Sequence, residues 1–146
     1  MKSIQKITRV HLKTNHKFDS ILLGIVSAEP DYKLSLSLNN KIRISLKNMS
    51  PVIIVDEKGT ELTFSRFADL NGTSGITYDL ISNRSGKNFL LKKLKNIDYL
   101  FQLHDPDNEM NISQLSANIR ELDTITGVFN IDLNIIKDKN LQYLIQ

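Results

Sequence analysis

Residues 96–133 read NIDYLFQLHDPDNEMNISQLSANIRELDTITGVFNIDL and contain the pattern of a strand, a helix and a second strand. The apolar run in 96–104, between polar ends, is typical of a buried strand. Residues 112–122 have apolar side chains at helical spacing, and Asn111 with Gln114 has the spacing of a capping box. Residues 127–133 predict the returning strand. This order resembles half of a ferredoxin-like unit.

The rest of the chain extends this pattern toward a larger sheet. Short apolar or alternating runs bounded by turn residues predict further strands at 3–12, 20–27, 51–56, 61–67 and 76–82, and a last apolar segment at 141–145. Only three prolines and six glycines occur, and no low-complexity stretch is long enough to be a linker. The sequence therefore predicts a single α+β domain over residues 1–146, with an antiparallel-rich sheet.

Residues 28–46 allow two interpretations. Leu34, Leu36 and Leu38 alternate with polar residues, which predicts a strand that turns at Asn39-Asn40 into a second strand over 42–46. Alternatively, Ser27 caps a helix whose first turn holds a proline and two acids. Periodicity alone favours the hairpin.

The amino-acid composition limits the functions that this chain can have. Of the 146 residues none is cysteine, which excludes disulfides, thiolate catalysis and cysteine-ligated metals. A cysteine-free chain fits a reducing cytosol, and we expect a cytoplasmic protein. The longest apolar run, 21–26, is too short to cross a bilayer, so no membrane association is expected. Residues 1–95 are basic and 96–146 acidic, but the two halves are expected to mix on the folded surface.

The densest group of metal-ligating side chains lies at His104 to Glu109. Asp105, Asp107 and Glu109 have the spacing of the first three ligands of a calcium loop. Met110, however, occupies the glycine position, and Ser116 occupies the position of the bidentate glutamate. We therefore expect no metal and no cofactor. Because no nucleophile elbow, phosphate-binding loop or dinucleotide fingerprint is present, a non-catalytic protein is favoured over an enzyme.

Nucleic acid is an unfavoured partner. The candidate contacts are Lys92, Lys93 and Lys95 in the segment LLKKLK. Few aromatic residues accompany them, and the predicted helix at 112–122 has no basic face. We expect any binding through these lysines to be weak, electrostatic and removed by salt.

Four phrases together resemble the IPExxxVDY family, small proteins of Bacteroidetes-group bacteria without an established function. They are DYKLSLSLN (31–39), YDLISN (78–83), FLLKKLKNIDYLFQL (89–103) and NLQYLI (140–145). Ile97, Asp98 and Tyr99 match the end of the naming motif, whereas Lys92 and Lys93 replace its proline and glutamate. The resemblance implies a helix at about 28–40 followed by a strand at 42–46, and we adopt this interpretation over the hairpin.

These observations favour a non-catalytic domain that acts through protein contacts, including self-association as a homodimer, because antiparallel strands leave edges that can pair with partners. The alternative is a small-molecule-binding, sensor-like domain, with Tyr32, Asn83 and Asp98 as candidate contact residues. An enzyme ranks below both. Tyr99 is predicted on the core face of its strand. Asp98, on the other face, is predicted to bind a turn backbone or a basic side chain such as Arg84, or else to face a pocket with Asn83.

Overall fold

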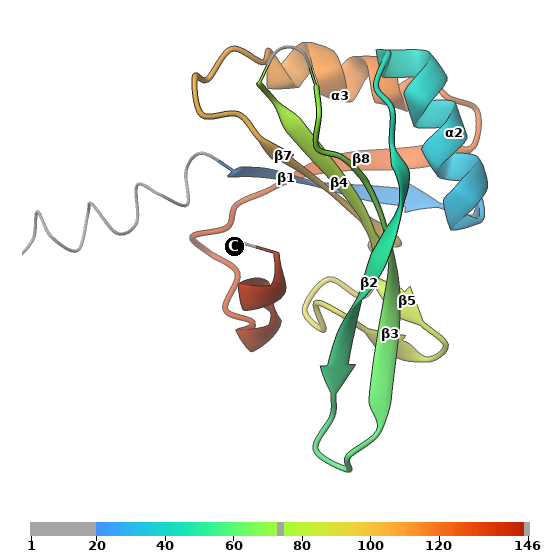
Figure 1. Ribbon diagram of the computed structural model, residues 1–146, viewed down its shortest axis with the longest axis vertical. Helices are drawn as coiled ribbons and strands as arrows, with labels where there is room; N and C mark the ends of the chain where they lie inside the picture. Colours follow the sequence, from blue (N-terminus) through green and yellow to red (C-terminus); the bar gives the residue numbers. More distant parts are fainter. Residues whose placement is uncertain (1–19, 73–74, 145–146) are drawn as a thin grey trace, which may run out of the picture.

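The computed structural model describes residues 20–72 and 75–144, and it shows an α+β fold built on one six-stranded antiparallel sheet (Figure 1). In spatial order the strands are β2 (Lys47–Val55), β3 (Glu61–Asp69), β4 (Thr77–Ser82), β7 (Tyr99–His104), β1 (Ser20–Ser27) and β8 (Ile125–Ile131). The helices α2 (Asp31–Ile42) and α3 (Ile112–Arg120) pack against one face of the sheet. The predicted fold class is confirmed.

The predicted strand–helix–strand unit is also present. Strand β1 pairs antiparallel with both β7 and β8, so β7 and β8 run in the same direction with β1 between them and α3 as the crossover. Strand β4 pairs antiparallel with the other side of β7. These elements form the ferredoxin-like part of the sheet. The β2–β3 hairpin adds two strands at one edge and extends beyond the helices (Figure 1).

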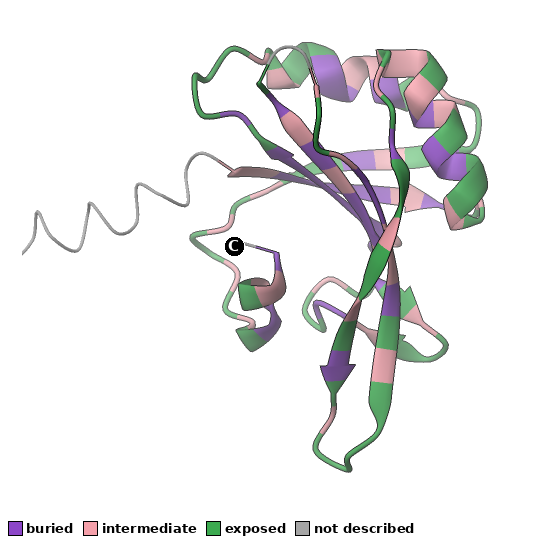
Figure 2. Ribbon diagram, in the orientation of Figure 1, coloured by how far each residue is buried: buried purple, intermediate pink, exposed green. Residues whose placement is uncertain are grey.

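The helix-covered face holds the first apolar core. Tyr99, Phe101 and Leu103 of β7 lie in it, as the alternation predicted. Tyr78 of β4 stacks on Phe101 with ring centroids 5.8 Å apart. The helices contribute side chains at i, i+4 spacing, namely Leu34 and Leu38 from α2 and Leu115 and Ile119 from α3. The strands at the centre of the sheet are largely buried (Figure 2).

The opposite face of the sheet has a different cover. Its core is packed by a loop segment over 83–98, which includes the short hairpin β5 (Arg84–Ser85) and β6 (Asn88–Phe89), and by the 3-10 helix η2 (Lys139–Tyr143). The buried members are Leu22, Ile54, Phe64, Ile81, Leu90, Leu91, Ile97, Leu100 and Leu144. A Cβ on Gly24 would lie 2.9 Å from Cδ1 of Ile97, so this glycine lets the loop pack closely on β1.

The helix expected at about 28–40 is confirmed as α2, but the strand expected at 42–46 is wrong. Arg43, in the left-handed conformation with φ 60°, closes the helix, and its N–H donates to the carbonyl of Asn39. The Asn39 side chain binds both the N–H and the C=O of Leu46, at 2.7 and 3.2 Å. Because Asn39 holds this connection, strand pairing starts only at Lys47.

Three further boundaries differ from the sequence interpretation. Ser27 ends β1 instead of capping α2, whose N-cap is Pro30 without a side-chain bond. Residues 96–98 precede β7 in a turn closed by the Ile97 N–H on the Leu94 carbonyl. The segment from residue 141 belongs to η2. The Asn111 cap of α3 is confirmed, accepting from the Gln114 N–H at 3.1 Å.

The strand expected at 3–12 lies outside the described residues. Within those residues, no helix has the length and apolar character needed to cross a membrane.

Candidate functional site

Asn83 is a fully buried amide whose groups are all engaged in holding the loop that follows β4. Its Nδ2 donates to the carbonyls of Leu94 and Ile97 at 2.9 and 3.0 Å, and its Oδ1 accepts from the Leu91 N–H at 2.8 Å. Its backbone N–H donates to the Asp98 carbonyl at 2.9 Å. With both donors and the acceptor occupied, Asn83 organises the loop and leaves no polar group for a ligand.

The Asp98 carboxylate joins β1 to the loop. Its Oδ2 accepts from the Ser27 N–H at 2.9 Å, and its Oδ1 accepts from Arg84 Nε at 2.6 Å. The Arg84 guanidinium also donates to the Lys95 carbonyl at 3.2 Å and lies 4.8 Å from the centroid of the Phe89 ring. The predicted bonding of Asp98 to a backbone group and to Arg84 is confirmed. Both oxygens are therefore engaged in structural contacts.

Tyr99 and Tyr32 lie in different environments. The Tyr99 hydroxyl donates to the carbonyl of Glu29, and the residue is buried in the first core. Burial raises the pKa of Tyr99 to about 12, with the nearby carboxylates of Asp31, Asp98 and Glu29 adding to the shift. The Tyr32 side chain, on α2, is 54% exposed. In the described part of the chain no hydrogen bond or ion pair links Tyr32 to Asn83 or Asp98, so the structure does not assemble the predicted trio.

The three candidate nucleic-acid lysines, Lys92, Lys93 and Lys95, are exposed on the loop. Their backbone has structural roles: the Lys92 N–H donates to Asp138 at 2.9 Å, and the Lys95 carbonyl accepts from Arg84. None of the three forms a salt bridge within the described residues. They form a solvated basic turn beside the second core.

Asp105 is the buried member of the acidic segment. Its two oxygens accept from the N–H groups of Glu109 and Met110 at 3.1 and 2.9 Å, and its carbonyl accepts from the Asn108 N–H. The carboxylate thus closes the turn that follows β7. The described residues contain no group of three or more metal-ligating side chains placed to hold an ion.

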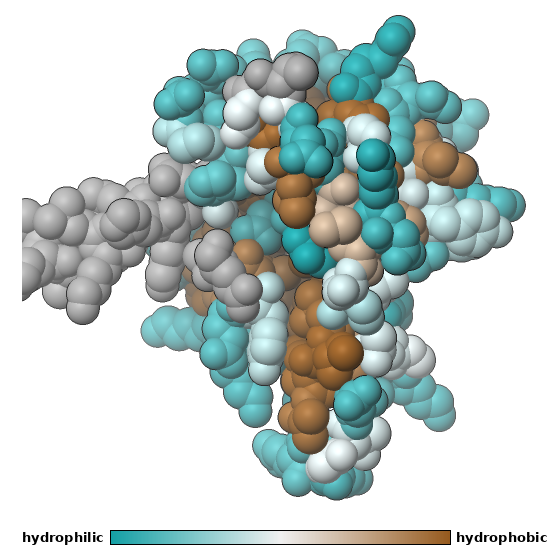
Figure 3. All heavy atoms as spheres, in the orientation of Figure 1, coloured by the Kyte–Doolittle hydropathy of each residue, from teal (hydrophilic) through white to brown (hydrophobic). Residues whose placement is uncertain are grey.

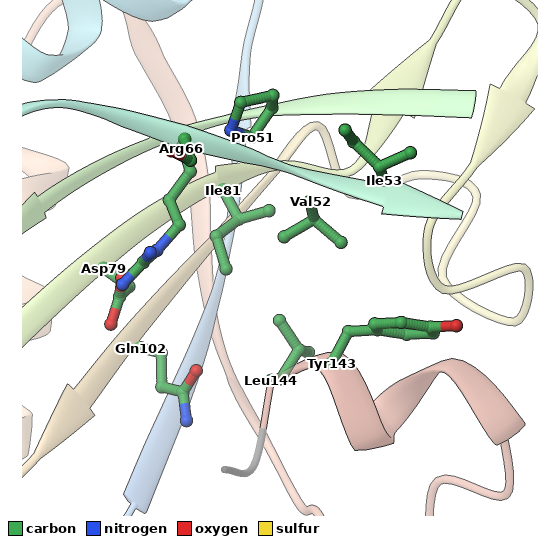
Figure 4. Close-up of a pocket in the computed structure, with 10 residues that line it drawn as sticks. Pro51, Val52, Ile53, Arg66, Asp79, Ile81, Gln102, Tyr143 and Leu144 are labelled. Atoms are coloured by element: carbon green, nitrogen blue, oxygen red, sulfur yellow. The ribbon is translucent and has the colours of Figure 1, made fainter. Parts of the chain in front are cut away.

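A hollow of about 390 Å³ lies on the second face of the sheet, between β2 and η2 (Figure 4). Three polar side chains meet there because of the strand register. Asp79 of β4 lies opposite Gln102 of β7, and Arg66 of β3 is diagonal to Asp79. Arg66 Nε donates to Asp79 Oδ1 at 2.6 Å, and these side chains are 28% and 20% exposed. The apolar part of the wall is Pro51, Val52, Ile53, Ile81, Tyr143 and Leu144.

Gln102 differs from the other buried polar residues of this face. The residue is 8% exposed, and its amide points into the hollow (Figure 4). No hydrogen bond of its side chain occurs in the described part of the chain. The amide atoms still reach the solvent in the hollow, since no fully enclosed side-chain nitrogen or oxygen atom of the described residues lacks a hydrogen-bond partner. This unpaired amide therefore marks the hollow as a candidate binding site.

The edge of β2 is a second candidate site. Over 52–55 the side chains alternate: Val52 and Ile54 face the second core, while Ile53 and Val55 point outward and are 48% and 63% exposed. An apolar patch covers this part of the hairpin in Figure 3. The sheet begins at β2, so in the described residues this strand pairs only with β3.

Comparisons with family models, curated proteins and solved structures find no match for this chain. The resemblance to the IPExxxVDY family stays a prediction that rests on the quoted phrases. Function is therefore inferred from the geometry of the hollow and the edge.

The sequence analysis did not identify the residues of the hollow. A signal was available in the strands YDLIS and YLFQLH, where Asp79 and Gln102 sit between large apolar residues. Such polar residues within otherwise apolar strands mark a face that is covered yet holds a polar site. Asp79 lies beside Gln102, and Arg66 reaches Asp79, only because of the strand register. The sequence alone did not provide this register.

Proposed function

We propose that the protein is a non-catalytic domain that acts through protein contacts, with a second copy of the chain bound along the β2 edge. The observation that supports this most is the outward pair Ile53 and Val55 on an edge strand that pairs only with β3 among the described residues. Exposed edges present unpaired backbone groups to a partner, and two exposed apolar side chains add a driving force for burial.

The strand itself limits where such pairing can occur. Pro51 cannot donate a backbone hydrogen bond, and the β2–β3 register shifts between Met49 and Val52. Both features disfavour pairing along the first half of the strand. The second half, 52–55, lacks them and is the segment that we assign to the contact.

A two-fold axis normal to the sheet at Ile54 gives a matched register. The two copies of the strand then run antiparallel. A residue that precedes Ile54 in one copy lies opposite the residue that follows Ile54 by the same number of positions in the other copy, with both side chains on the same face. Ile53 faces Val55 of the second copy, and the reverse pair repeats the contact. Each apolar cross-strand pair contributes about 0.2–1 kcal/mol beyond the backbone bonds. Both exposed side chains are thereby covered by one symmetric contact.

The test is the mass in solution of the full chain and of two lysine variants, measured by sedimentation equilibrium over a concentration series. The unchanged chain is expected to be a dimer that dissociates on dilution. Val55→Lys should be monomeric, because each lysine would face the apolar Ile53 of the partner. Val55 is chosen because Ile53 also lines the hollow.

Leu36→Lys provides the matched control, since Leu36 is 61% exposed on α2, away from the edge. It should leave the dimer unchanged. A chain that is monomeric throughout the concentration series would overturn the proposal, as would a Val55→Lys variant that dimerises as well as the control.

A further inference from the structure

Asn71 and Gly72 form the only Asn-Gly pair in the sequence, and the pair lies in the loop that follows β3. An asparagine before glycine can lose its side-chain amide spontaneously. The next backbone nitrogen attacks the amide carbon, and glycine has no side chain to block the approach. Asparagine is accordingly one of the thermolabile residues of proteins. Whether a given pair reacts in a folded chain depends on how firmly the fold holds it.

The structure leaves the reacting groups of this pair free. Asn71 is exposed, and its side-chain amide has no hydrogen bond in the described part of the chain; only its backbone N–H is engaged, donating to Asp69 at 3.3 Å. The Gly72 N–H, which must supply the attacking nitrogen, likewise has no partner among the described residues. Pairing between β3 and β4 ends at Asp69 and Tyr78, so no strand bond restrains the pair.

The fold itself requires the glycine of the pair. A Cβ on residue 72 would lie 2.7 Å from the carbonyl oxygen of Ile76, which is closer than a Cβ and a backbone oxygen can pack. The Gly72 carbonyl accepts from the Gly75 N–H at 3.3 Å, as in a turn. A larger residue after Asn71 would slow the reaction, but it would not fit here. The close approach therefore keeps the labile pair in the chain.

Asn83 shows the opposite arrangement. It is fully buried, both of its amide donors and its amide oxygen are bonded, and the next residue is an arginine instead of a glycine. The Arg84 N–H, which is the group that would have to attack, donates to the Ser82 hydroxyl at 3.3 Å. The fold therefore protects Asn83 and leaves Asn71 open to reaction.

We propose that Asn71 is a site of spontaneous deamidation in the folded protein. The deprotonated backbone nitrogen of Gly72 bonds to Cγ of Asn71, and the Cγ–Nδ2 bond breaks to release ammonia. The five-membered succinimide ring that results then takes up one water molecule. Opening at Cγ gives aspartate, and opening at the main-chain carbonyl gives isoaspartate. Nothing is oxidised or reduced, and the net change is the exchange of ammonia for water.

The new carboxylate forms beside two cations. Asn71 lines a hollow of about 490 Å³ together with Arg43 and Lys47, and neither cation forms a salt bridge within the described residues. Asp69, the one acid of this lining, already accepts from the N–H groups of Ser45 and Asn71. The reaction thus adds one negative charge where positive charge is available, outside the strand pairing and outside the segment assigned to the dimer contact.

The test is incubation of the folded full chain at neutral pH and body temperature in water enriched in ¹⁸O, followed by trypsin digestion and tandem mass spectrometry. Cleavage after Arg66 and Arg84 gives one peptide, 67–84, that contains both Asn71 and Asn83. Hydrolysis of the succinimide takes its oxygen from the labelled water. Deamidation during the incubation therefore adds about 3 Da, whereas deamidation during digestion in ordinary water adds about 1 Da.

The labelled mass gain is expected at Asn71 and not at Asn83, and it should rise with pH, because the attacking nitrogen must first lose its proton. The full chain unfolded in guanidinium chloride is the reference, and Asn71 should react in the folded chain within about tenfold of its rate there. Asn71→Gln keeps an amide but needs a six-membered ring to react, so it should abolish the gain. Protection of Asn71 in the folded chain by more than about tenfold overturns the proposal, as does a labelled gain that Asn71→Gln leaves unchanged.

Discussion

Two buried amides on the same side of the sheet have opposite hydrogen-bonding states. Asn83, with no exposed surface, donates to two carbonyls and accepts from one N–H. Gln102 is 8% exposed and has no partner among the described residues. Backbone bonds offset the cost of burying the Asn83 amide, whereas the Gln102 amide avoids that cost because its nitrogen and oxygen still reach solvent. The comparison separates a residue that holds the structure together from one that is available to a ligand.

The surroundings of the two amides explain the difference. The loop around Asn83 folds back on itself, so its carbonyls and N–H groups lie where a short side chain reaches them. Gln102 lies in the middle of a central strand whose backbone groups pair with β1 and β4. The strand neighbours therefore use their backbone polar groups in the sheet, and only the hollow can supply partners for the amide.

The largest effect is expected for Asn83→Leu. The substitution leaves three backbone groups without their partner, buried ones on Leu91 and Ile97 and a partly buried one on Leu94, and each unsatisfied buried group costs about 1–3 kcal/mol. We expect a loss of roughly 3–5 kcal/mol in the free energy of unfolding, measured by urea denaturation. A loss below about 1 kcal/mol would contradict the assigned role and remove the contrast with Gln102.

An intermediate effect is expected for Asp98→Ala. It removes the acceptor of the Ser27 N–H and the partner of Arg84, but water can reach the half-exposed Arg84. The expected loss is about 1–3 kcal/mol, and Asp98→Asn should lose less because one carbonyl oxygen remains. The same denaturation series measures both. Unchanged or increased stability of Asp98→Ala would indicate that the carboxylate serves a ligand instead of the fold.

The sequence predicted the fold where apolar periodicity coincides with burial. Residues 21–26 form a continuous apolar run, as expected for β1, which spans Ser20–Ser27 and lies between two strands. The alternation at Leu34, Leu36 and Leu38 was misleading, since a helix also places Leu34 and Leu38 on one face and leaves Leu36 exposed. Local periodicity cannot separate two structures that bury the same pair.

The candidate site was less predictable because it depends on contacts distant in sequence. Arg84 lies close to Asp98 in the sequence, in the preceding turn, and the contact between these two residues was predicted. Arg66, Asp79 and Gln102 come from three strands and meet only through the pairing register. In each strand alone, the polar residue indicates a polar position on one face but not which residues it meets there. The position of β2 at the edge of the sheet, as the described residues show it, likewise follows from strand order, which the sequence did not specify.

The smallest effect on stability, and the most direct test of the contrast between the two amides, belongs to Gln102→Leu. The change replaces an amide that has no partner among the described residues, and whose atoms reach solvent, by an apolar side chain of similar size, so no protein hydrogen bond is lost. Urea denaturation of this variant beside the unchanged chain should show equal stability, or a gain of up to about 1 kcal/mol. A loss of more than about 1 kcal/mol would show that Gln102 supports the fold as Asn83 does, and would contradict its assignment as a free ligand-binding group.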